Sequence, residues 1–421
     1  MPIPAREPSF IWATGIEDTF IPQAAKTTGR ALDEYELTQH YHFWREDLNL
    51  AASLGLRWMR YGIPWYRVNP APGVFDWSWV DKVLERMLID LRIEPIIDLV
   101  HYGCPLWLHG QFGSREYPER VADYAAAFVE RYRDVVRYFT PLNEPWMHAY
   151  LCGYTAAWPP NMRGWRGWTR LTMGLVKGMS LTIAAVRDLR RDAAVVHVEA
   201  ASSFIAGDNA GDADVAVWWA RRFLATDLIH GWVDEGHPLR GWLLEKGASV
   251  DQLEWLCAHP ATIDVMGTNF YPGLNVWKVV NDGGATTRKR YYGGTAELET
   301  VLRRYYERYR KPIMITETST PGPVWRRERW MDGSLGVVHQ LRREGVPVIG
   351  YTWWPMFSLV GWPYRRGQKL KKAYLAHMGL WDLRESGDGT LVRTRTPLVD
   401  KYAACLANAA GTVGPLGERP C

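Results

Sequence analysis

The chain has 421 residues, 47% of them hydrophobic, and its 50 Lys+Arg against 46 Asp+Glu give a formal net charge of +4. This composition is typical of an ordered globular protein and excludes a collagen-like, low-complexity or wholly disordered chain. Because so balanced a charge offers no polybasic surface, we expect neither nucleic acid nor a membrane as a partner. Tryptophan is frequent, with 23 residues, whose rings could pack in a core or form a platform for a sugar.

The cysteines and the N-terminal residues bear on cofactors and location. The five cysteines are Cys104, Cys152, Cys257, Cys405 and Cys421, and they form no CxxC pair. We therefore expect neither a disulfide framework nor a metal site, and no cofactor. Residues 1–8 lack the apolar run of a secretory leader, and no later run approaches the roughly 18 apolar residues of a membrane span. These features predict a cytoplasmic protein.

Short apolar runs bounded by turn residues recur along the chain and predict strands. They lie at residues 10–16, 56–63, 94–101, 137–144, 194–202, 264–271, 312–319 and 348–355. Segments of helical periodicity lie between them, at residues 41–54, 79–91, 120–132, 168–190, 295–309 and 329–344. Strands that alternate with helices in this way predict an α/β fold, a (β/α)8 TIM barrel.

No linker, internal repeat or low-complexity tract divides the chain. We expect a single catalytic barrel domain over residues 1–408 and a loose tail over residues 409–421. In such barrels the active site lies at the C-terminal ends of the strands. Polar residues gather at the ends of the predicted strands, namely His101, Asn143, Glu144, Glu199, Asn269, Tyr271 and Glu317.

Two glutamates, Glu144 and Glu317, end the fourth and seventh predicted strands, which face each other across a barrel mouth. One such Glu is more often a structural partner in a salt bridge. A facing pair is what cleavage of a glycosidic bond requires, with one carboxyl as acid and the other as base or nucleophile. The pair therefore favours a glycosidase.

The motifs around these glutamates resemble those of a known family. Asn143-Glu144-Pro145 resembles the Asn-Glu-Pro motif of the retaining β-glycosidases of glycoside hydrolase family 1, and residues 315–318 resemble its Ile-Thr-Glu-Asn nucleophile motif. Residues 59–65, 101–108 and 267–271 are similar to its Tyr-Arg-Phe-Ser-Ile-Ser-Trp, His-Trp-Asp-Leu-Pro-Gln-Trp-Leu and Gly-Ile-Asn-Tyr-Tyr motifs. The order and spacing of these motifs hold nearly end to end, as in a divergent member of the family.

The resemblance implies a reaction and roles for its residues. It implies a retaining β-glycosidase that hydrolyses a small β-glycoside by double displacement, with Glu317 as nucleophile and Glu144 as acid/base. Arg60 would hold Glu317 as a carboxylate, Tyr271 would donate a hydrogen bond to it, and Asn143 would bind the 2-hydroxyl of the sugar.

The resemblance also implies a set of sugar contacts. Asn269, Trp354 and Trp362 would bind the sugar, with Trp354 as the floor of the subsite for the cleaved residue. His101 would be a further contact, although a structural buried histidine is an equally good interpretation. Glu199 has no counterpart in the family, and either faces the substrate or is paired.

Two positions depart from the family pattern. Gly361 stands where the family has a Glu that holds the 4- and 6-hydroxyls, and the family's first-strand Gln is absent, so that Glu17 or Asp18 would take its place. These changes predict an altered specificity at the 4-/6-hydroxyl subsite. The basic run of residues 365–372 is either a solvated loop or a contact for an anionic substituent.

Three other functions stay open. The same site could serve a transglycosylase or a phospho- or uronic-β-glycosidase. A non-catalytic sugar-binding protein is disfavoured, since both glutamates are present. The identity of the sugar, the aglycone and the oligomeric state do not follow from the sequence.

Overall fold

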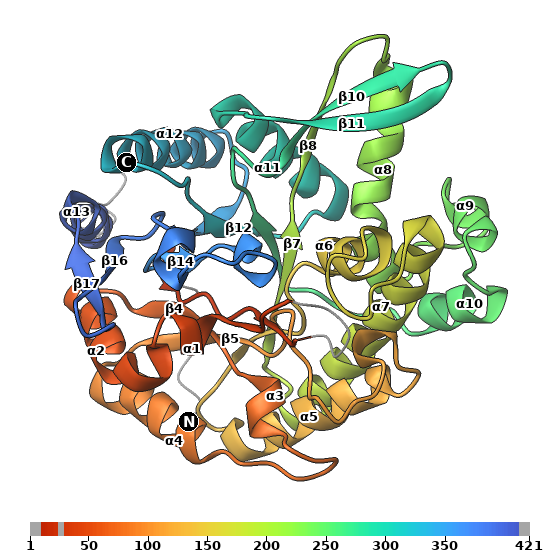
Figure 1. Ribbon diagram of the computed structural model, residues 1–421. Helices are drawn as coiled ribbons and strands as arrows, with labels where there is room; N and C mark the ends of the chain where they lie inside the picture. Colours follow the sequence, from red (N-terminus) through yellow and green to blue (C-terminus); the bar gives the residue numbers. More distant parts are fainter. Residues whose placement is uncertain (1–9, 24–28, 412–421) are drawn as a thin grey trace, which may run out of the picture.

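The computed structural model describes residues 10–23 and 29–411, and its centre is a closed barrel of eight parallel strands (Figure 1). In order around the barrel these are β1 (Ile11–Gly15), β13 (Val348–Trp353), β12 (Ile313–Thr318), β9 (Val265–Asn269), β7 (Ala194–Ala200), β6 (Tyr138–Thr140), β5 (Glu94–Asp98) and β4 (Trp58–Gly62). Each strand lies within one of the segments predicted from the sequence. The prediction of a TIM barrel is therefore confirmed.

Helices surround the barrel (Figure 1). The longer ones are α2 (His40–Ser53), α4 (Ser78–Glu85) with its π-helical continuation η1 (Arg86–Asp90), α5 (Tyr117–Tyr132), α7 (Gly164–Leu189), α8 (Asp212–Ile229), α10 (Val250–Ala258), α11 (Thr295–Tyr309), α12 (Val324–Arg343) and α13 (Pro397–Gly411). The short ones are α1 (Glu34–Leu37), α3 (Trp65–Val68), η2 (Gln111–Gly113), α6 (Pro145–Ala149), η3 (Tyr150–Tyr154), α9 (Arg240–Glu245), η4 (Trp362–Arg365) and η5 (Lys371–Tyr374). All six predicted helical segments correspond to helices of the outer layer.

The barrel strands are apolar because both of their faces are covered. Every residue of β12 is buried, as expected for a parallel strand between a packed interior and a layer of helices. The inside of the barrel is filled by a cluster of apolar side chains, Ile11, Ala13, Ile96, Val196, Val198 and Met314. The interior is thus a packed core. The polar residues of the candidate site lie above it, toward the C-terminal ends of the strands.

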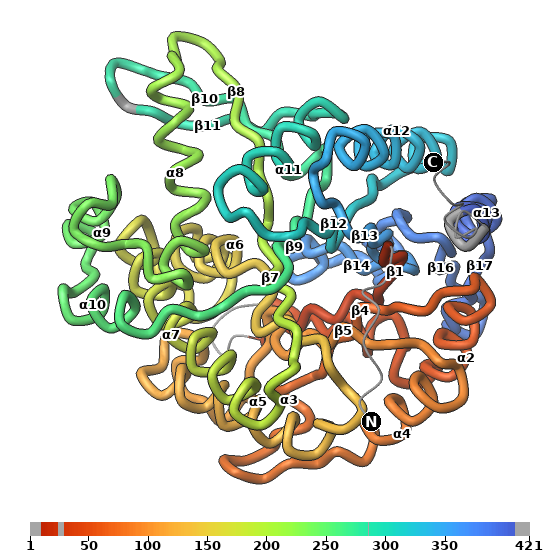
Figure 2. Tube along the Cα trace, turned by 180° about the vertical axis from the view of Figure 1, so that it is seen from behind, coloured from red at the N-terminus to blue at the C-terminus, as the bar shows by residue number. Residues whose placement is uncertain are grey.

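An arm that the sequence analysis did not predict extends from the barrel. It contains β8 (Ser203–Ala206), β10 (Val276–Asp282) and β11 (Ala285–Tyr291), which form one sheet beside α8. Both views of the chain show this arm projecting beyond the ring of helices (Figures 1 and 2).

Short strand pairs complete the fold. They are β2 (Phe20–Ile21) with β3 (Leu32–Asp33), β14 (Leu359–Val360) with β15 (Leu375–Ala376), and β16 (Trp381–Glu385) with β17 (Leu391–Arg395). The chain is described as far as Gly411, at the end of α13. Residues 412–421, which make up most of the predicted tail, lie outside the described residues, so the boundary at residue 408 stays a prediction.

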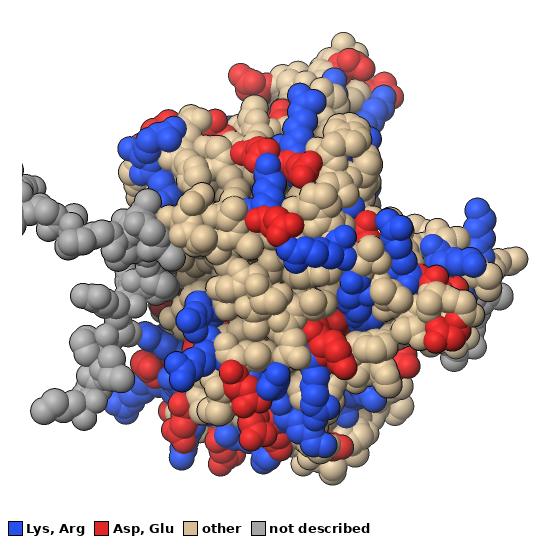
Figure 3. Space-filling model, turned by 90° about the vertical axis from the view of Figure 1, so that its left-hand side faces the viewer, with Lys and Arg blue, Asp and Glu red and all other residues tan. Residues whose placement is uncertain are grey.

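Several features bear on location and partners. Cys104, Cys152, Cys257 and Cys405 are free, and Cys421 lies outside the described residues. No helix in the described part of the chain is long and apolar enough to cross a membrane. On the face shown in Figure 3, Lys and Arg side chains are interspersed with Asp and Glu, so this face carries no field of one sign.

Candidate active site

Glu317 lies near the C-terminal end of β12, where the pairing with β9 and β13 becomes irregular. The Tyr271 hydroxyl donates to Glu317 Oε2 over 2.7 Å, and Arg60 Nη1 donates to Oε1. Burial raises the pKa of Glu317 to about 7, although the positive charge of Arg60 acts in the opposite direction. Both partners expected for Glu317 are therefore in contact with it.

Arg60, on β4, is completely buried and serves more than one carboxylate. Its Nη2 donates to Asp98 Oδ2 and, over 2.8 Å, to Asn143 Oδ1. Asp98, the last residue of β5, was not singled out from the sequence. The available signal was a charged residue inside an apolar run, three positions before His101. Arg60 thus forms ion pairs with both Asp98 and Glu317, so its single positive charge is shared between two carboxylates.

Glu144 follows β6 in a left-handed backbone conformation, with φ of 49°, and occupies the N-cap position of α6, where its side chain forms no capping hydrogen bond. Its backbone N–H donates to Val198 O on β7 over 3.0 Å, which fixes the residue between neighbouring strands. Asn269 Nδ2 donates to Glu144 Oε1 over 2.9 Å, and the Tyr102 hydroxyl donates to Oε2. In the described part of the chain, no Lys, Arg or His forms an ion pair with Glu144. This carboxyl is held by neutral donors alone.

Tyr102 is a second residue that the sequence analysis missed. It follows His101 directly, is buried, and has a left-handed backbone with φ of 65°. A non-glycine residue in that region is strained, and such strain is common at functional sites. Sequence alone could not show that this tyrosine reaches Glu144.

Two asparagines connect the halves of the site. Asn269 Nδ2 also lies 3.2 Å from Asn143 Oδ1, while Thr316 Oγ1 donates to Asn269 Oδ1 over 2.7 Å. Asn143 Nδ2 in turn lies 3.1 Å from His101 Nε2. Hydrogen bonds therefore link the predicted residues of five strand ends into one network.

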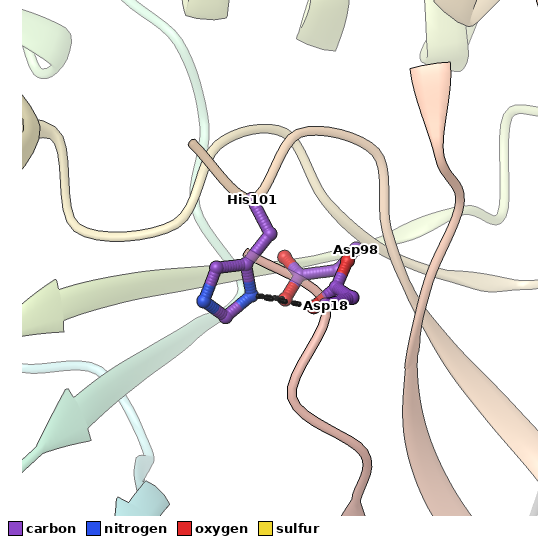
Figure 4. Close-up of side chains that lie close together, drawn as sticks. All are labelled: Asp18, Asp98 and His101. Atoms are coloured by element: carbon purple, nitrogen blue, oxygen red, sulfur yellow. Dashed lines mark hydrogen bonds and ion pairs between the residues drawn. The ribbon is translucent and has the colours of Figure 1, made fainter. Parts of the chain in front are cut away.

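His101 faces three carboxylates, of which Figure 4 draws Asp18 and Asp98. Its Nδ1 lies 2.9 Å from Asp18 Oδ1 and 3.2 Å from Asp98 Oδ2, and its Nε2 lies 3.6 Å from Glu17 Oε1. Burial alone would lower the pKa of His101, but Asp18 and Glu17 outweigh it and raise that pKa well above its usual value. Both residues proposed to replace the family's Gln thus lie at the site.

Asp18, Asp98 and His101 lie closely enough for one atom of each to bind a common metal ion. Their donor atoms are already engaged with one another and with Arg60. The Arg60 guanidinium, bound to Asp98, opposes a divalent metal ion placed between Asp98 and His101. We therefore describe the cluster as an ion-pair network.

The two predicted sugar-binding tryptophans differ in exposure. Trp354 is fully buried: His101 stacks on its ring, Arg60 Cζ lies 4.8 Å from the ring centroid, and its Nε1 donates to Glu17 Oε2 over 3.0 Å. Its face is therefore covered and does not form an open floor for a sugar. Trp362 is 37% exposed and packs against Trp158, so it lies at the rim of the site.

The surroundings of Gly361, where the resemblance implies a Glu, leave little room for a side chain but include a carboxyl from another segment. A Cβ at this position would lie 3.3 Å from Tyr374 O, so the space is narrow. A carboxyl is nevertheless near, because Glu34 Oε2 accepts a hydrogen bond from the neighbouring Val360 N–H over 3.0 Å. Glu34 is completely buried, and burial raises its pKa well above the usual value.

The basic run and Glu199 have different surroundings. Arg365 is buried and donates to two carbonyls, Ala157 O and Pro22 O, whereas Arg366, Lys369 and Lys372 are exposed. Glu199, on β7, is completely buried and accepts from the Ala200 N–H over 2.8 Å. Burial raises the pKa of Glu199 to about 8, which favours the protonated form of this carboxyl.

Comparison with known proteins identifies related chains. The family model described as Glycosyl hydrolase family 1 matches residues 13–217. Beta-glucosidase A of Thermotoga maritima is 24% identical over 370 residues, which cover 77% of this chain and 78% of the relative. The aryl-phospho-beta-D-glucosidase BglH of Bacillus subtilis is 23% identical over 410 residues, covering 87% of this chain and 85% of the relative.

Solved structures show the same fold. The family 1 β-glucosidase from Thermotoga maritima superposes with a TM-score of 0.79 at 19% identity, covering 95% of this chain and 98% of that one. The same enzyme has been solved in complex with deoxynojirimycin. The family model, the relatives that match along most of the chain and the shared barrel all support membership of glycoside hydrolase family 1 and indicate an O-glycosyl hydrolase.

Proposed function

We propose that this family member is a retaining β-glycosidase that hydrolyses a small β-glycoside by double displacement. In the first step Glu317 attacks the anomeric carbon and forms a glycosyl ester, while Glu144 donates a proton to the leaving oxygen. In the second step Glu144 takes a proton from water, whose oxygen attacks the anomeric carbon and releases Glu317 as a carboxylate. Both carboxyls then regain their starting states.

The observation that carries this proposal is the difference between the partners of the two carboxyls. Glu317 is bound by a guanidinium and a phenol, from Arg60 and Tyr271, which stabilise its ionised form. Glu144 is bound only by the neutral donors of Tyr102 and Asn269, which is suited to a group that must carry and release a proton. Two carboxyls in such different settings match the roles of nucleophile and acid/base.

The neighbouring residues fit supporting roles in this reaction. Asn143 is held by Arg60 and lies beside both halves of the site, and we assign it to the 2-hydroxyl of the sugar. His101, Asn269 and the rim residue Trp362 are assigned to substrate binding. The Trp354 indole N–H donates a hydrogen bond to Glu17 and so helps to hold that side chain in place.

We further propose that the sugar specificity differs from that of a plain β-glucosidase. Gly361 offers no side chain to a sugar, and Glu17 and Asp18 bring carboxylates to the site instead. Loss of a buried hydrogen bond to the sugar weakens transition-state binding by about 1.5–3 kcal/mol when a charged group is involved. An unmodified glucoside should therefore be a poor substrate.

Two related activities are alternatives on the same site. A transglycosylase would use an acceptor alcohol in place of water in the second step, and the two are separated by measuring product partition in added methanol. A phospho- or uronic-β-glycosidase would use exposed cations of the basic run, Arg366, Lys369 and Lys372.

The free state of the four described cysteines supports our proposal that the enzyme works in the cytoplasm.

The proposal is tested by covalent trapping. Activated 2-deoxy-2-fluoro β-glycosides slow the second step, so that the sugar should remain attached to Glu317 and be located there by peptide mass spectrometry. A Glu317→Gln variant should take no label, and Glu130→Gln, at an exposed glutamate of α5, should be labelled as the wild type is. Label on another residue, or no label from any sugar of a broad panel, would overturn the proposal and favour a non-catalytic sugar-binding protein.

A further inference from the structure

The site contains more carboxyl groups than groups that can balance them. Its carboxyls are those of Glu17, Asp18, Asp98, Glu144 and Glu317. The groups able to carry a positive charge in the same network are Arg60 and His101. Even with both cations counted, negative charge is in excess in a buried space, where it is costly.

The two cations are already engaged. Arg60 is shared by Asp98 and Glu317, and His101 pairs with Asp18 over 2.9 Å. The nearest donors to Glu17 are neutral, from Thr19 and from Trp354 Nε1. The excess charge is therefore concentrated on the side of the site formed by the loop after β1.

Oxygen atoms on this side have few hydrogen-bond donors. Asp98 is 0% exposed, yet its Oδ1 accepts no hydrogen bond from the described part of the chain, and Asp18 Oδ1 has His101 Nδ1, at 2.9 Å, as its charged partner. Each carboxylate oxygen can accept two hydrogen bonds, and buried acceptors normally have partners. The acceptor capacity that the described residues leave unfilled points to a ligand that donates hydrogen bonds.

The chain is also shaped to hold Asp18 in this place. Gly62, at the end of β4, leaves room for the Asp18 carboxyl, because a Cβ there would lie 1.5 Å from Asp18 Oδ2. Gly15, at the end of β1, likewise leaves room for Trp354, whose ring carbon Cζ3 would lie 2.0 Å from a Cβ. Two glycines thus set the position of the acidic side relative to the reacting carboxyls.

We propose that the sugar unit cleaved by this enzyme carries a protonated amine, and that the carboxylates of Glu17 and Asp18 bind its ammonium group. This inference rests on the proposed glycosidase function and names its substrate class, an amino sugar joined by a β-glycosidic bond. An ammonium group supplies three hydrogen-bond donors and a positive charge. A phosphate or uronate would instead place a third anion beside these two carboxylates.

Binding of a cation would also help the nucleophile. Burial raises the pKa of Asp18 to about 6 and that of Glu317 to about 7, and Glu17 raises both further. The groups that face Glu317 are Arg60, Tyr271, Glu144, His101 and Glu17. A substrate ammonium near Glu17 would favour the ionised forms of the carboxyls, including the form of Glu317 that attacks the sugar.

The test compares matched nitrophenyl β-glycosides that carry an amine, a hydroxyl or an acetamide at one ring position, each ring position in turn. At a pH where the amine is protonated, we expect kcat/KM for the amine to exceed that of its hydroxyl and acetamide counterparts by about tenfold or more at one position. Asp18→Asn and Glu17→Gln should reduce this ratio. Asp123→Asn, at an exposed ion pair with Arg120, should leave it unchanged.

The outcomes separate this inference from the proposed function. If Glu317 is labelled and hydroxyl substrates are cleaved at least as well as amines at every position, the substrate class is wrong while the glycosidase stands. If no glycoside is cleaved and no label forms, the glycosidase fails. Calorimetric titration with methyl amino-glycosides and methyl glycosides then tests binding without catalysis. If the amino-glycoside binds no more tightly than the plain glycoside, the proposed recognition of an ammonium group is overturned. Thermal unfolding of both variants shows that they are folded.

Discussion

Replacement of Tyr102 by phenylalanine removes one hydroxyl from the acid/base side of the site and leaves the ring in place. The Tyr102 hydroxyl donates to Glu144 Oε2, and both side chains are buried. In the proposed reaction this bond strengthens as Glu144 gives up its proton and becomes charged. A hydrogen bond to a charged group contributes about 1.5–3 kcal/mol, and the lower figure corresponds to roughly a tenfold change in rate.

The leaving group tells this effect apart from a general loss of activity. A dinitrophenolate leaves without protonation, whereas a methylphenolate needs the proton of Glu144. For Tyr102→Phe we expect kcat/KM to fall about tenfold for a methylphenyl β-glycoside and to change little for the dinitrophenyl one. Tyr132→Phe, which removes a hydroxyl bound to Asp81 far from the site, should leave both values unchanged. Equal losses for the two leaving groups, or none, would refute the role given to Tyr102.

Three further results are expected. Wild-type kcat/KM should rise with pH through a midpoint near 7, because Glu317 attacks only when ionised and burial raises its pKa to about 7; a midpoint at the ordinary value of a glutamic acid would contradict this. Gly62→Ala would place a Cβ 1.5 Å from Asp18 Oδ2, and should lower the free energy of unfolding by about 1–3 kcal/mol in a denaturant titration. Unchanged stability would mean that Asp18 lies elsewhere. Asp227→Asn weakens the ion pair between the buried Asp227 and the partly exposed Arg308 that joins α8 to α11, and should cost about 1.5–3 kcal/mol in thermal unfolding; a loss under about 1 kcal/mol would argue against the pair.

The barrel could be predicted from the sequence because each strand is a short apolar run followed by polar residues. The predicted segments run past the strand ends for the same reason. β5 ends at Asp98 and β6 at Thr140, whereas the predictions extended to His101 and Glu144. Those polar residues lie in the loops that build the site, and a pattern of residue types does not show where hydrogen bonding between strands stops.

The arm could not be predicted in this way. β11 contains Arg288, Lys289 and Arg290 in succession, which in a sequence is typical of an exposed loop. In the structure Arg288 Cζ lies 4.3 Å from the ring centroid of Trp277 and 4.8 Å from that of Trp218. Contacts between a cation and aromatic rings that are distant in sequence depend on the tertiary fold. The local pattern of polar and apolar residues therefore does not predict them.

The candidate site could be predicted from the sequence at residues that belong to recognisable motifs. It could not be predicted where residues from distant segments come into contact. The motifs led to Glu144, Glu317 and Arg60, whereas the contact of Tyr102 with Glu144 joins different strand ends. Trp354 was expected to be an open floor, but its covered face follows from packing against His101 and Arg60. Residue type suggested a sugar platform, and only the packed structure shows that the face is occupied.

The sharing of Arg60 between Asp98 and Glu317 has a consequence for the covalent intermediate. When Glu317 becomes an ester in the proposed reaction, it loses its charge, and a buried guanidinium that served it alone would be left without a counter-ion. Breaking a buried pair in this way typically costs about 3–5 kcal/mol. Asp98 takes no part in the proposed reaction and keeps its contact with Arg60. It therefore acts as a permanent counter-ion, which makes the energy of the intermediate less dependent on the charge that the nucleophile gives up.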